Sequence, residues 1–131
     1  MPSIAIPLVM VVDDNADIRD AMAEMLKLAG YDVVCAENGQ DALDQLRSGV
    51  RPCLVLLDLE MPVMGGLEFR KEQMHDPDLA GIPIAIYSAR DKTDTLPASL
   101  RVEHHFQKPI DFGRLFDLVA RYCDAPKQSG N

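Results

Sequence analysis

Three aspartates, Asp13, Asp14 and Asp58, are the residues of this sequence with the clearest chemical potential. Each stands at the end of a short apolar run, as do Ser88 and Lys108. Three carboxylates brought together repel one another and weaken a fold unless a cation offsets their charge. Their donor atoms are oxygens and no His or Cys belongs to the motif, so a hard cation such as Mg²⁺ suits them best. The residue types therefore predict a Mg²⁺ site, provided that the fold brings the aspartates together.

An alternation of strands and helices is predicted to position these residues. Short apolar runs alternate with segments of helical period, which is typical of βαβ units and of an α/β fold with a parallel sheet. We expect strands over residues 8–12, 32–36, 53–57, 82–87 and 104–107. We expect helices over about 17–29, over 38–48, after Gly65-Gly66, and from the N-cap Asp111 onward.

This alternation places the polar residues at one edge of the sheet. The carboxyl ends of parallel strands share an edge, and open α/β sheets bind their ligands there. Four of the five predicted strands end in one of the candidate residues, so we expect the side chains to converge. An Asp-Asp pair alone would be weak evidence for a metal site, because most such pairs are solvated residues of loops or helix caps. The pair together with Asp58 and Lys108-Pro109 is strong evidence.

Length and composition indicate a single soluble domain. The chain has 131 residues, of which 47% are apolar and 26% are charged. Its net charge of -8 argues against direct binding to nucleic acid, which requires clustered Lys and Arg. Residues 1–12 lack a basic leader and a cleavage site, which favours a cytoplasmic protein without membrane insertion. We expect an N-terminal extension over 1–7, one domain over 8–123 and a flexible tail over 124–131.

The three cysteines, Cys35, Cys53 and Cys123, have no spacing typical of metal ligands. Two of them fall inside apolar segments. In a reducing cytoplasm this pattern predicts free, buried thiols and no disulfide framework.

Four motifs of the chain resemble those of response-regulator receiver domains. They are Val11-Val12-Asp13-Asp14-Asn15, the run 56–66 with Asp58 near its start, Tyr87-Ser88-Ala89 and Lys108-Pro109. The resemblance covers residues 8 to about 123. It implies a flavodoxin-like, doubly wound (βα)5 fold with five parallel strands in the order 2-1-3-4-5. The interval between Ser88 and Lys108 is short for the family and contains Pro97, so we expect a short or irregular fourth helix.

The resemblance also implies how the metal is held. Asp14 would be a direct ligand and Asp13 would bind a water of the ion. Asp58 and the backbone carbonyl of Glu60 would complete the contribution of the protein. Gly65-Gly66 would form the turn that follows, although a turn there is equally ordinary without any function.

Asp58 would be the phosphoacceptor according to the same resemblance, with Ser88 and Lys108 contacting the phosphoryl group. Phosphoryl transfer needs little beyond positioning and neutralisation of charge, which Mg²⁺ and a lysine can supply. Ser88 could instead simply cap a helix, and Lys108 could be an ordinary exposed lysine. His105 stands where many receivers carry Tyr or Phe, and with Ser88 it is our candidate switch residue. Histidine changes charge near neutral pH, so switching could be pH-sensitive, but a half-buried polar residue is the commoner case.

The function predicted from these residues is a phosphoacceptor signalling module rather than an enzyme with an external substrate. Its donor would be a phosphohistidine on a histidine kinase or on a histidine phosphotransfer protein. The output partner is unknown, and the chain would be a monomer or a weak dimer. A phosphohydrolase of the haloacid-dehalogenase type is one alternative, but Asp13-Asp14 are adjacent where those enzymes have Asp-x-Asp. A degenerate receiver that serves only as an interaction surface is another alternative. It conflicts with the presence of all five residues that the chemistry requires, Asp13, Asp14, Asp58, Ser88 and Lys108.

Overall fold

The computed structural model describes residues 7–59, 61, 63–88, 104–107 and 111–123. In this part of the chain, five parallel strands form one sheet in the order β2-β1-β3-β4-β5. The strands are β1 (Leu8–Val12), β2 (Asp32–Ala36), β3 (Leu54–Asp58), β4 (Ile84–Ser88) and β5 (His104–Gln107). The helices are α1 (Ala16–Leu28), α2 (Gly39–Arg47), α3 (Gly66–His75) and α4 (Phe112–Cys123). The predicted α/β class and the strand order are confirmed, and the element boundaries differ from the predicted ones by at most two residues.

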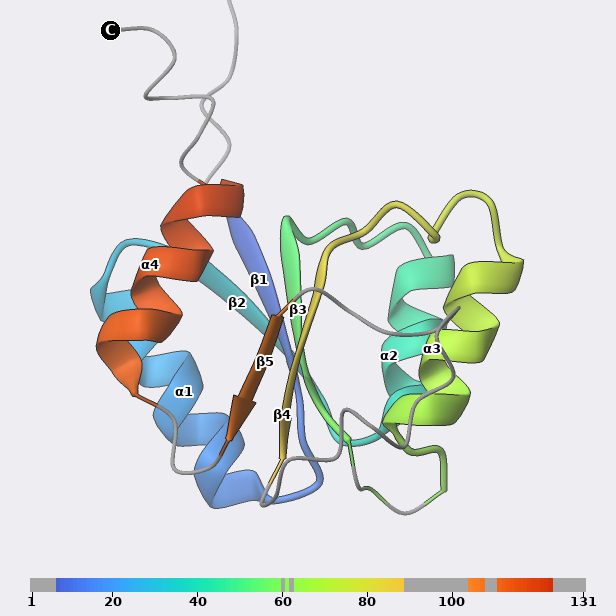
Figure 1. The fold of residues 1–131 in the computed structure, drawn as a ribbon, viewed down its shortest axis with the longest axis horizontal. Coiled ribbons are helices and arrows are strands. Elements are labelled where there is room, and N and C mark those ends of the chain that lie inside the picture. Colours follow the sequence, from blue (N-terminus) through green and yellow to red (C-terminus); the bar gives the residue numbers. More distant parts are fainter. Residues whose placement is uncertain (1–6, 60, 62, 89–103, 108–110, 124–131) are drawn as a thin grey trace, which may run out of the picture.

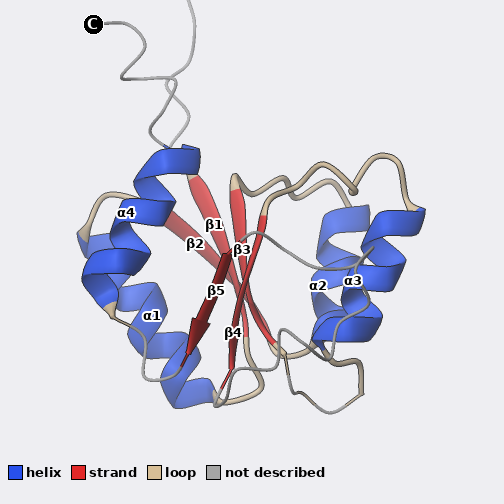
Figure 2. Ribbon diagram, in the orientation of Figure 1, coloured by secondary structure: helices blue, strands red, loops and turns tan. Residues whose placement is uncertain are grey.

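Helices cover both faces of the sheet, with α1 and α4 on one face and α2 and α3 on the other (Figures 1 and 2). Each pair of helices closes its own apolar cluster against alternate residues of the strands. Leu54 and Leu56 of β3 pack toward α1 and α4, whereas Val55 and Leu57 pack toward α2 and α3. Because β3 is buried on both faces, its sequence is continuously apolar up to Asp58.

Side chains fix the points where the helices begin. Asn15 accepts hydrogen bonds from the backbone N–H groups of Asp17 and Ile18, and Asn38 caps α2 in the same way through Asp41. Asp111 accepts from the N–H groups of Gly113 and Arg114, as its predicted N-cap role requires. Each cap satisfies donors that a helix cannot bond internally. The cap at Asn15 matters for the site, because it lies two residues after Asp13 and α1 begins at the next residue.

A buried glutamine anchors α3, a helix with a weak apolar stripe. Gln73 is fully buried, and its side-chain amide donates to the carbonyl oxygens of Leu79 and Ile82 at 3.0 Å each. Arg70 donates to the amide oxygen of the same side chain at 2.7 Å. These bonds tie α3 to the connection that leads into β4, and so they fix where β4 begins relative to β3.

The prediction that all cysteines are free is wrong. Cys53 and Cys123 form a disulfide across a sequence separation of 70 residues, and their Cα atoms lie 5.5 Å apart. Cys53 directly precedes β3, and Cys123 is the last residue of α4, which packs over that strand. The two cysteines meet because of this packing, which their spacing in the sequence does not reveal. Cys35 of β2 is a free thiol, as predicted.

Some predictions fall on parts of the chain outside the described residues. These are the short fourth helix within 89–103, the N-terminal extension and the C-terminal tail. No helix of the described part is long and apolar enough to cross a membrane.

Candidate functional site

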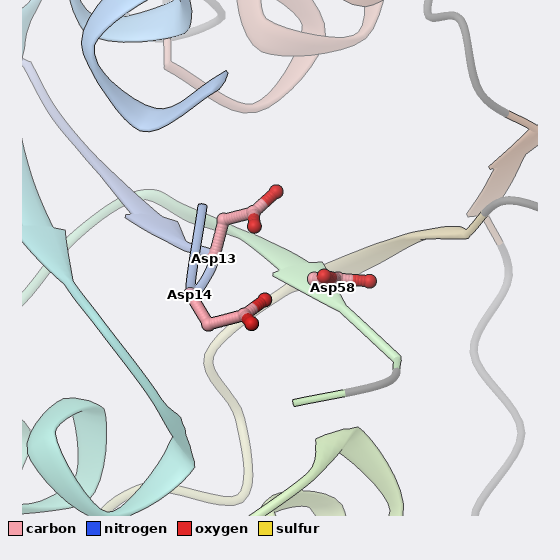
Figure 3. A group of neighbouring side chains, drawn as sticks. All are labelled: Asp13, Asp14 and Asp58. Carbon is pink, nitrogen blue, oxygen red and sulfur yellow. The ribbon is translucent and has the colours of Figure 1, made fainter. Parts of the chain in front are cut away.

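The three aspartates singled out in the sequence meet at the carboxyl ends of β1 and β3 (Figure 3). Asp13 and Asp14 directly follow β1, and Asp58 is the last residue of β3. The two strands are paired, with Val12 opposite Leu57, which brings their ends side by side. One carboxylate oxygen from each aspartate lies within 4.8 Å of the other two. The predicted convergence of the aspartates is therefore confirmed.

Burial makes this acidic cluster costly without a cation. Asp13 is fully buried and Asp58 is only 4% exposed, whereas Asp14 is exposed. Charges of the same sign repel more strongly in a buried setting than in water. The donors are all carboxylate oxygens, and the exposed side at Asp14 leaves room for water ligands. This combination suits Mg²⁺, which binds through one or two carboxylates and keeps several waters.

Two donors from the described part of the chain contact the carboxylate of Asp13. The backbone N–H of Asn15 donates to Oδ1, and the Tyr87 hydroxyl donates to Oδ2, each over 2.8 Å. Arg19 of α1 donates to the backbone carbonyl of Asp13, also at 2.8 Å. Burial, reinforced by the neighbouring Asp13, raises the pKa of Tyr87 well above its ordinary value. Tyr87 therefore remains a protonated donor throughout the physiological range.

Tyr87 is a site residue that the sequence reasoning did not single out. It lies in β4 directly opposite Asp58, and paired residues of neighbouring strands point to the same face of a sheet. A signal was present, because Tyr87 bears a hydroxyl after the apolar residues Ile84–Ile86 of the strand, on the face that Asp58 also occupies. Its contact with Asp13 is compatible with the strand order that the resemblance implied, but that order does not show that the side chain reaches across β3.

The two candidate switch residues lie in contact. Ser88, the buried last residue of β4, has its Oγ 3.2 Å from Nε2 of His105 in β5. His104 faces the opposite way, and its Nε2 lies 2.8 Å from the Tyr122 hydroxyl of α4. Alternation along β5 thus gives the two histidines different neighbours. Lys108 and Glu60, the remaining predicted site residues, lie outside the described residues.

A glycine allows the loop after β3 to fold close to Asp58. The N–H of Gly66 donates to the carbonyl oxygen of Leu59 at 2.9 Å. A Cβ at Gly66 would come within 2.9 Å of the Leu59 Cα and 3.1 Å of the Asp58 carbonyl oxygen. The predicted turn at Gly65-Gly66 is therefore a close approach of α3 to the end of β3, which only glycine permits.

Known proteins match this chain over most of its length. The model of the response regulator receiver domain matches residues 9–120. Sporulation initiation phosphotransferase F of Bacillus subtilis is 34% identical over 116 residues, which are 87% of this chain and 91% of the relative. Response regulator MprA of Mycolicibacterium vanbaalenii is 34% identical over 86% of this chain, but the match spans only 47% of that longer protein.

A solved structure agrees with these matches. Response regulator protein TrrA of Thermotoga maritima, in complex with Mg²⁺–BeF, has a TM-score of 0.78 and 31% identity, covering 89% of this chain and 99% of that one. Receiver domains are phosphoacceptor signalling domains that bind Mg²⁺ at an acidic pocket and interact with histidine kinases or phosphotransfer proteins. Together with the fold and the acidic cluster, these matches show that the chain belongs to the response regulator receiver family and is a receiver domain of a two-component system.

Proposed function

We propose that this receiver domain accepts a phosphoryl group on Asp58 from a phosphohistidine, in a reaction that depends on Mg²⁺. The observation that carries the proposal is the meeting of Asp58 with Asp13 and Asp14 at the end of the central strand. Asp58 is almost completely buried, but the neighbouring carboxylate of Asp14 is exposed. A phosphoryl donor can therefore approach Asp58 from the side of Asp14.

Asp13, Asp14 and Asp58, with the backbone carbonyl of Glu60, would hold the metal. When bound, Mg²⁺ supplies positive charge that offsets the carboxylates and the oxygens of the phosphoryl group. The complex of the related TrrA with Mg²⁺–BeF supports this assignment. Tyr87 and the N–H of Asn15 keep the carboxylate of Asp13 oriented, so that less ordering is needed when the ion binds.

Asp58 acts as the nucleophile in this proposal. One carboxylate oxygen forms a bond to phosphorus as the bond between phosphorus and the donor histidine nitrogen breaks. The leaving imidazole keeps the electron pair of that bond. Lys108 would place its ammonium against the phosphoryl oxygens. Turnover would be limited to hydrolysis of the chain's own phosphoaspartate, so the domain would not process an external substrate.

Ser88 and His105 form the switch in this proposal. The hydroxyl of Ser88 is shared with Nε2 of His105 at 3.2 Å when Asp58 carries no phosphoryl group. A phosphoryl group on Asp58 offers stronger acceptor oxygens to the same hydroxyl, because a hydrogen bond to a charged acceptor is stronger than a neutral one. Ser88 would turn toward it, and the contact between Ser88 and His105 would be lost. Phosphorylation of Asp58 would then change the contacts of His105 in β5.

The partners follow from this chemistry. The donor is a histidine kinase or a histidine phosphotransfer protein in the cytoplasm, and the domain acts as a monomer or weak dimer without direct contact with nucleic acid. The net charge of -8 is consistent with a protein partner. Relatives of the MprA type are about twice the length of the match, so the output can also reside in a further segment or in a separate protein.

Labelling with a small acyl phosphate tests the proposal. The wild-type chain, incubated with acetyl phosphate and Mg²⁺, should gain the mass of one phosphoryl group, and a peptide map should place it on Asp58. Asp58→Asn should gain none, whereas Asp78→Asn, which changes an exposed aspartate, should react like the wild type. Ser88→Ala should still be labelled. A label on Ser88, His104 or His105, or labelling that persists in Asp58→Asn, would overturn the assignment.

A further inference from the structure

The disulfide between Cys53 and Cys123 joins the central strand to the last helix. Cys53 is held at the start of β3, where its N–H donates to the carbonyl oxygen of Leu8 at 2.9 Å. Cys123 ends α4, whose Leu115 and Val119 pack with Leu54 of β3 in one apolar cluster. The bond lies at the amino end of β3, and Asp58 lies at its carboxyl end. The cysteines therefore form a second chemical site, separate from the acidic cluster.

We propose that Cys53 and Cys123 are a reversible redox site, which is a dithiol under reducing conditions and a disulfide when small disulfides accumulate. The proposal rests on the cytoplasmic function proposed above. Thiols are kept reduced in that compartment, where disulfides are usually transient, catalytic or redox-sensing. With the bond formed, the Cα atoms of the two cysteines lie 5.5 Å apart, which is the ordinary separation for a disulfide.

Exposure gives the two sulfurs different roles. Cys53 is partly exposed, whereas Cys123 is only 7% exposed. The thiolate of Cys53 attacks oxidised glutathione and forms a mixed disulfide, releasing one glutathione thiolate. The thiolate of Cys123 then attacks the Cys53 sulfur, which forms the internal disulfide and releases the second glutathione. Each cysteine gives up one proton, and the two electrons pass to the glutathione disulfide, which is reduced to two thiols.

Cys35 provides an internal control. It is a free thiol in β2, and burial raises its pKa, which lowers the fraction of reactive thiolate. Oxidation should therefore select the pair Cys53 and Cys123 over any bond to Cys35.

The bond also bears on the contact between α4 and β5. Tyr122, next to Cys123, hydrogen-bonds His104 of β5 at 2.8 Å and meets its ring edge-on at a centroid distance of 5.5 Å. In the disulfide state the last turn of α4 is held in place, and Tyr122 is held over His104. In the dithiol state this turn is free to fray, as helix ends do when packing alone holds them. Oxidation should thus slow the exchange of amide hydrogens in the last turn of α4.

The test uses the full chain, equilibrated with mixtures of reduced and oxidised glutathione. As the fraction of oxidised glutathione rises, the mass of wild type and of Cys35→Ser should fall by that of two hydrogen atoms. The mass should be restored when that fraction is lowered. A peptide map should link residues 53 and 123. Cys123→Ser should instead retain one glutathione on Cys53. Amide exchange in the last turn of α4 should be at least tenfold slower in the oxidised wild type.

Three results would overturn the redox site. They are a disulfide that survives a large excess of reduced glutathione in the folded chain, the absence of the bond in excess oxidised glutathione, and a bond that includes Cys35. The mass and the peptide map of the wild type decide these outcomes even if a serine variant does not fold. Asp58→Asn should keep the redox behaviour unchanged. A chain that oxidises reversibly without accepting a phosphoryl group would therefore refute only the proposed function.

Discussion

The hydroxyl of Tyr87 donates a hydrogen bond to Oδ2 of Asp13 over 2.8 Å, and both side chains are fully buried. The two residues are 74 positions apart in the sequence, in β4 and directly after β1. With β3 between these strands, the bond spans the sheet beneath the acidic cluster. A charged, buried carboxylate gains more from such a donor than an exposed one, because water cannot replace the donor.

Tyr87→Phe should weaken both the fold and the metal site. Removing a hydrogen bond to a charged, buried group costs about 1.5–3 kcal/mol of the free energy of unfolding. The dissociation constant for Mg²⁺ should rise about tenfold, because metal affinity falls when a residue that orients a metal ligand is removed. Urea unfolding with and without Mg²⁺ measures both effects. Tyr122→Phe is the matched control, since its hydroxyl contacts His104 instead, and it should leave Mg²⁺ affinity unchanged.

Alkaline pH should destabilise the protein through the same residue. The pKa of Tyr87 is raised in the folded state, so the folded chain keeps a proton that the unfolded chain releases above about pH 10. The contribution of Tyr87 to stability is thus complete below pH 10 and declines as pH rises above it. The decline amounts to about 1.4 kcal/mol per pH unit for one proton. Urea unfolding between pH 9 and 11 should give a steeper slope for wild type than for Tyr87→Phe, and equal slopes would contradict the buried donor.

The fold could be predicted because each element carries its own signal. The apolar runs of β1 and β3, the asparagine caps of α1 and α2 and the glycines at 30 and 49 mark the boundaries locally. Once the strands are taken to be parallel, the meeting of Asp13, Asp14 and Asp58 follows, because the carboxyl ends share an edge. Their close contact also requires β1 and β3 to be neighbours, an order that the resemblance to receiver domains implied.

The features that escaped prediction depend on packing between distant elements. The bond from Tyr87 to Asp13 requires the Tyr87 side chain to reach across β3, which the predicted strand order allows but does not specify. The disulfide between Cys53 and Cys123 requires α4 to lie over the start of β3. Cysteine spacing alone pointed to free thiols, and only the fold brings the two cysteines together. Both features are contacts between residues at least 70 positions apart.

Mg²⁺ should stabilise the folded chain by offsetting the repulsion among the aspartates. At ten times its dissociation constant, mass action alone adds about 1.4 kcal/mol to the free energy of unfolding. Asp14→Asn should lose most of this gain, and without metal it should be no less stable than wild type because one repulsive charge is gone. Asp78→Asn, at an exposed position away from the cluster, should keep the gain. Thermal melts that do not respond to millimolar Mg²⁺ would refute the metal site.

Gly66→Ala should push the start of α3 away from Asp58. The added Cβ would meet the Cα of Leu59 at 2.9 Å, and both the Leu59 Cδ1 and the Asp58 carbonyl oxygen at 3.1 Å. Relief requires a shift of backbone, which typically costs about 1–3 kcal/mol. Gly81→Ala is the matched control, since nothing lies within 4 Å of its new Cβ. Both variants can be compared by urea unfolding and by phosphorylation with acetyl phosphate. Only Gly66→Ala should be slower to react, and equal behaviour of the two would show that the loop tolerates a side chain.

Oxidation of Cys53 and Cys123 should raise the free energy of unfolding. A bond across 70 residues removes loop-closure entropy from the unfolded chain, which is worth roughly 4 kcal/mol in the chain-entropy model. Unfolding of the oxidised chain in urea, compared with the same chain in excess reductant, measures the difference. Cys35→Ser should show the full difference, because Cys35 takes no part in the bond. Cys123→Ser should show none, since its stability cannot depend on a bond that it is unable to form. A difference below about 1 kcal/mol in the wild type would contradict this expectation. It would mean that α4 and β3 stay in contact in the unfolded state of the reduced chain, so that the disulfide removes little further entropy.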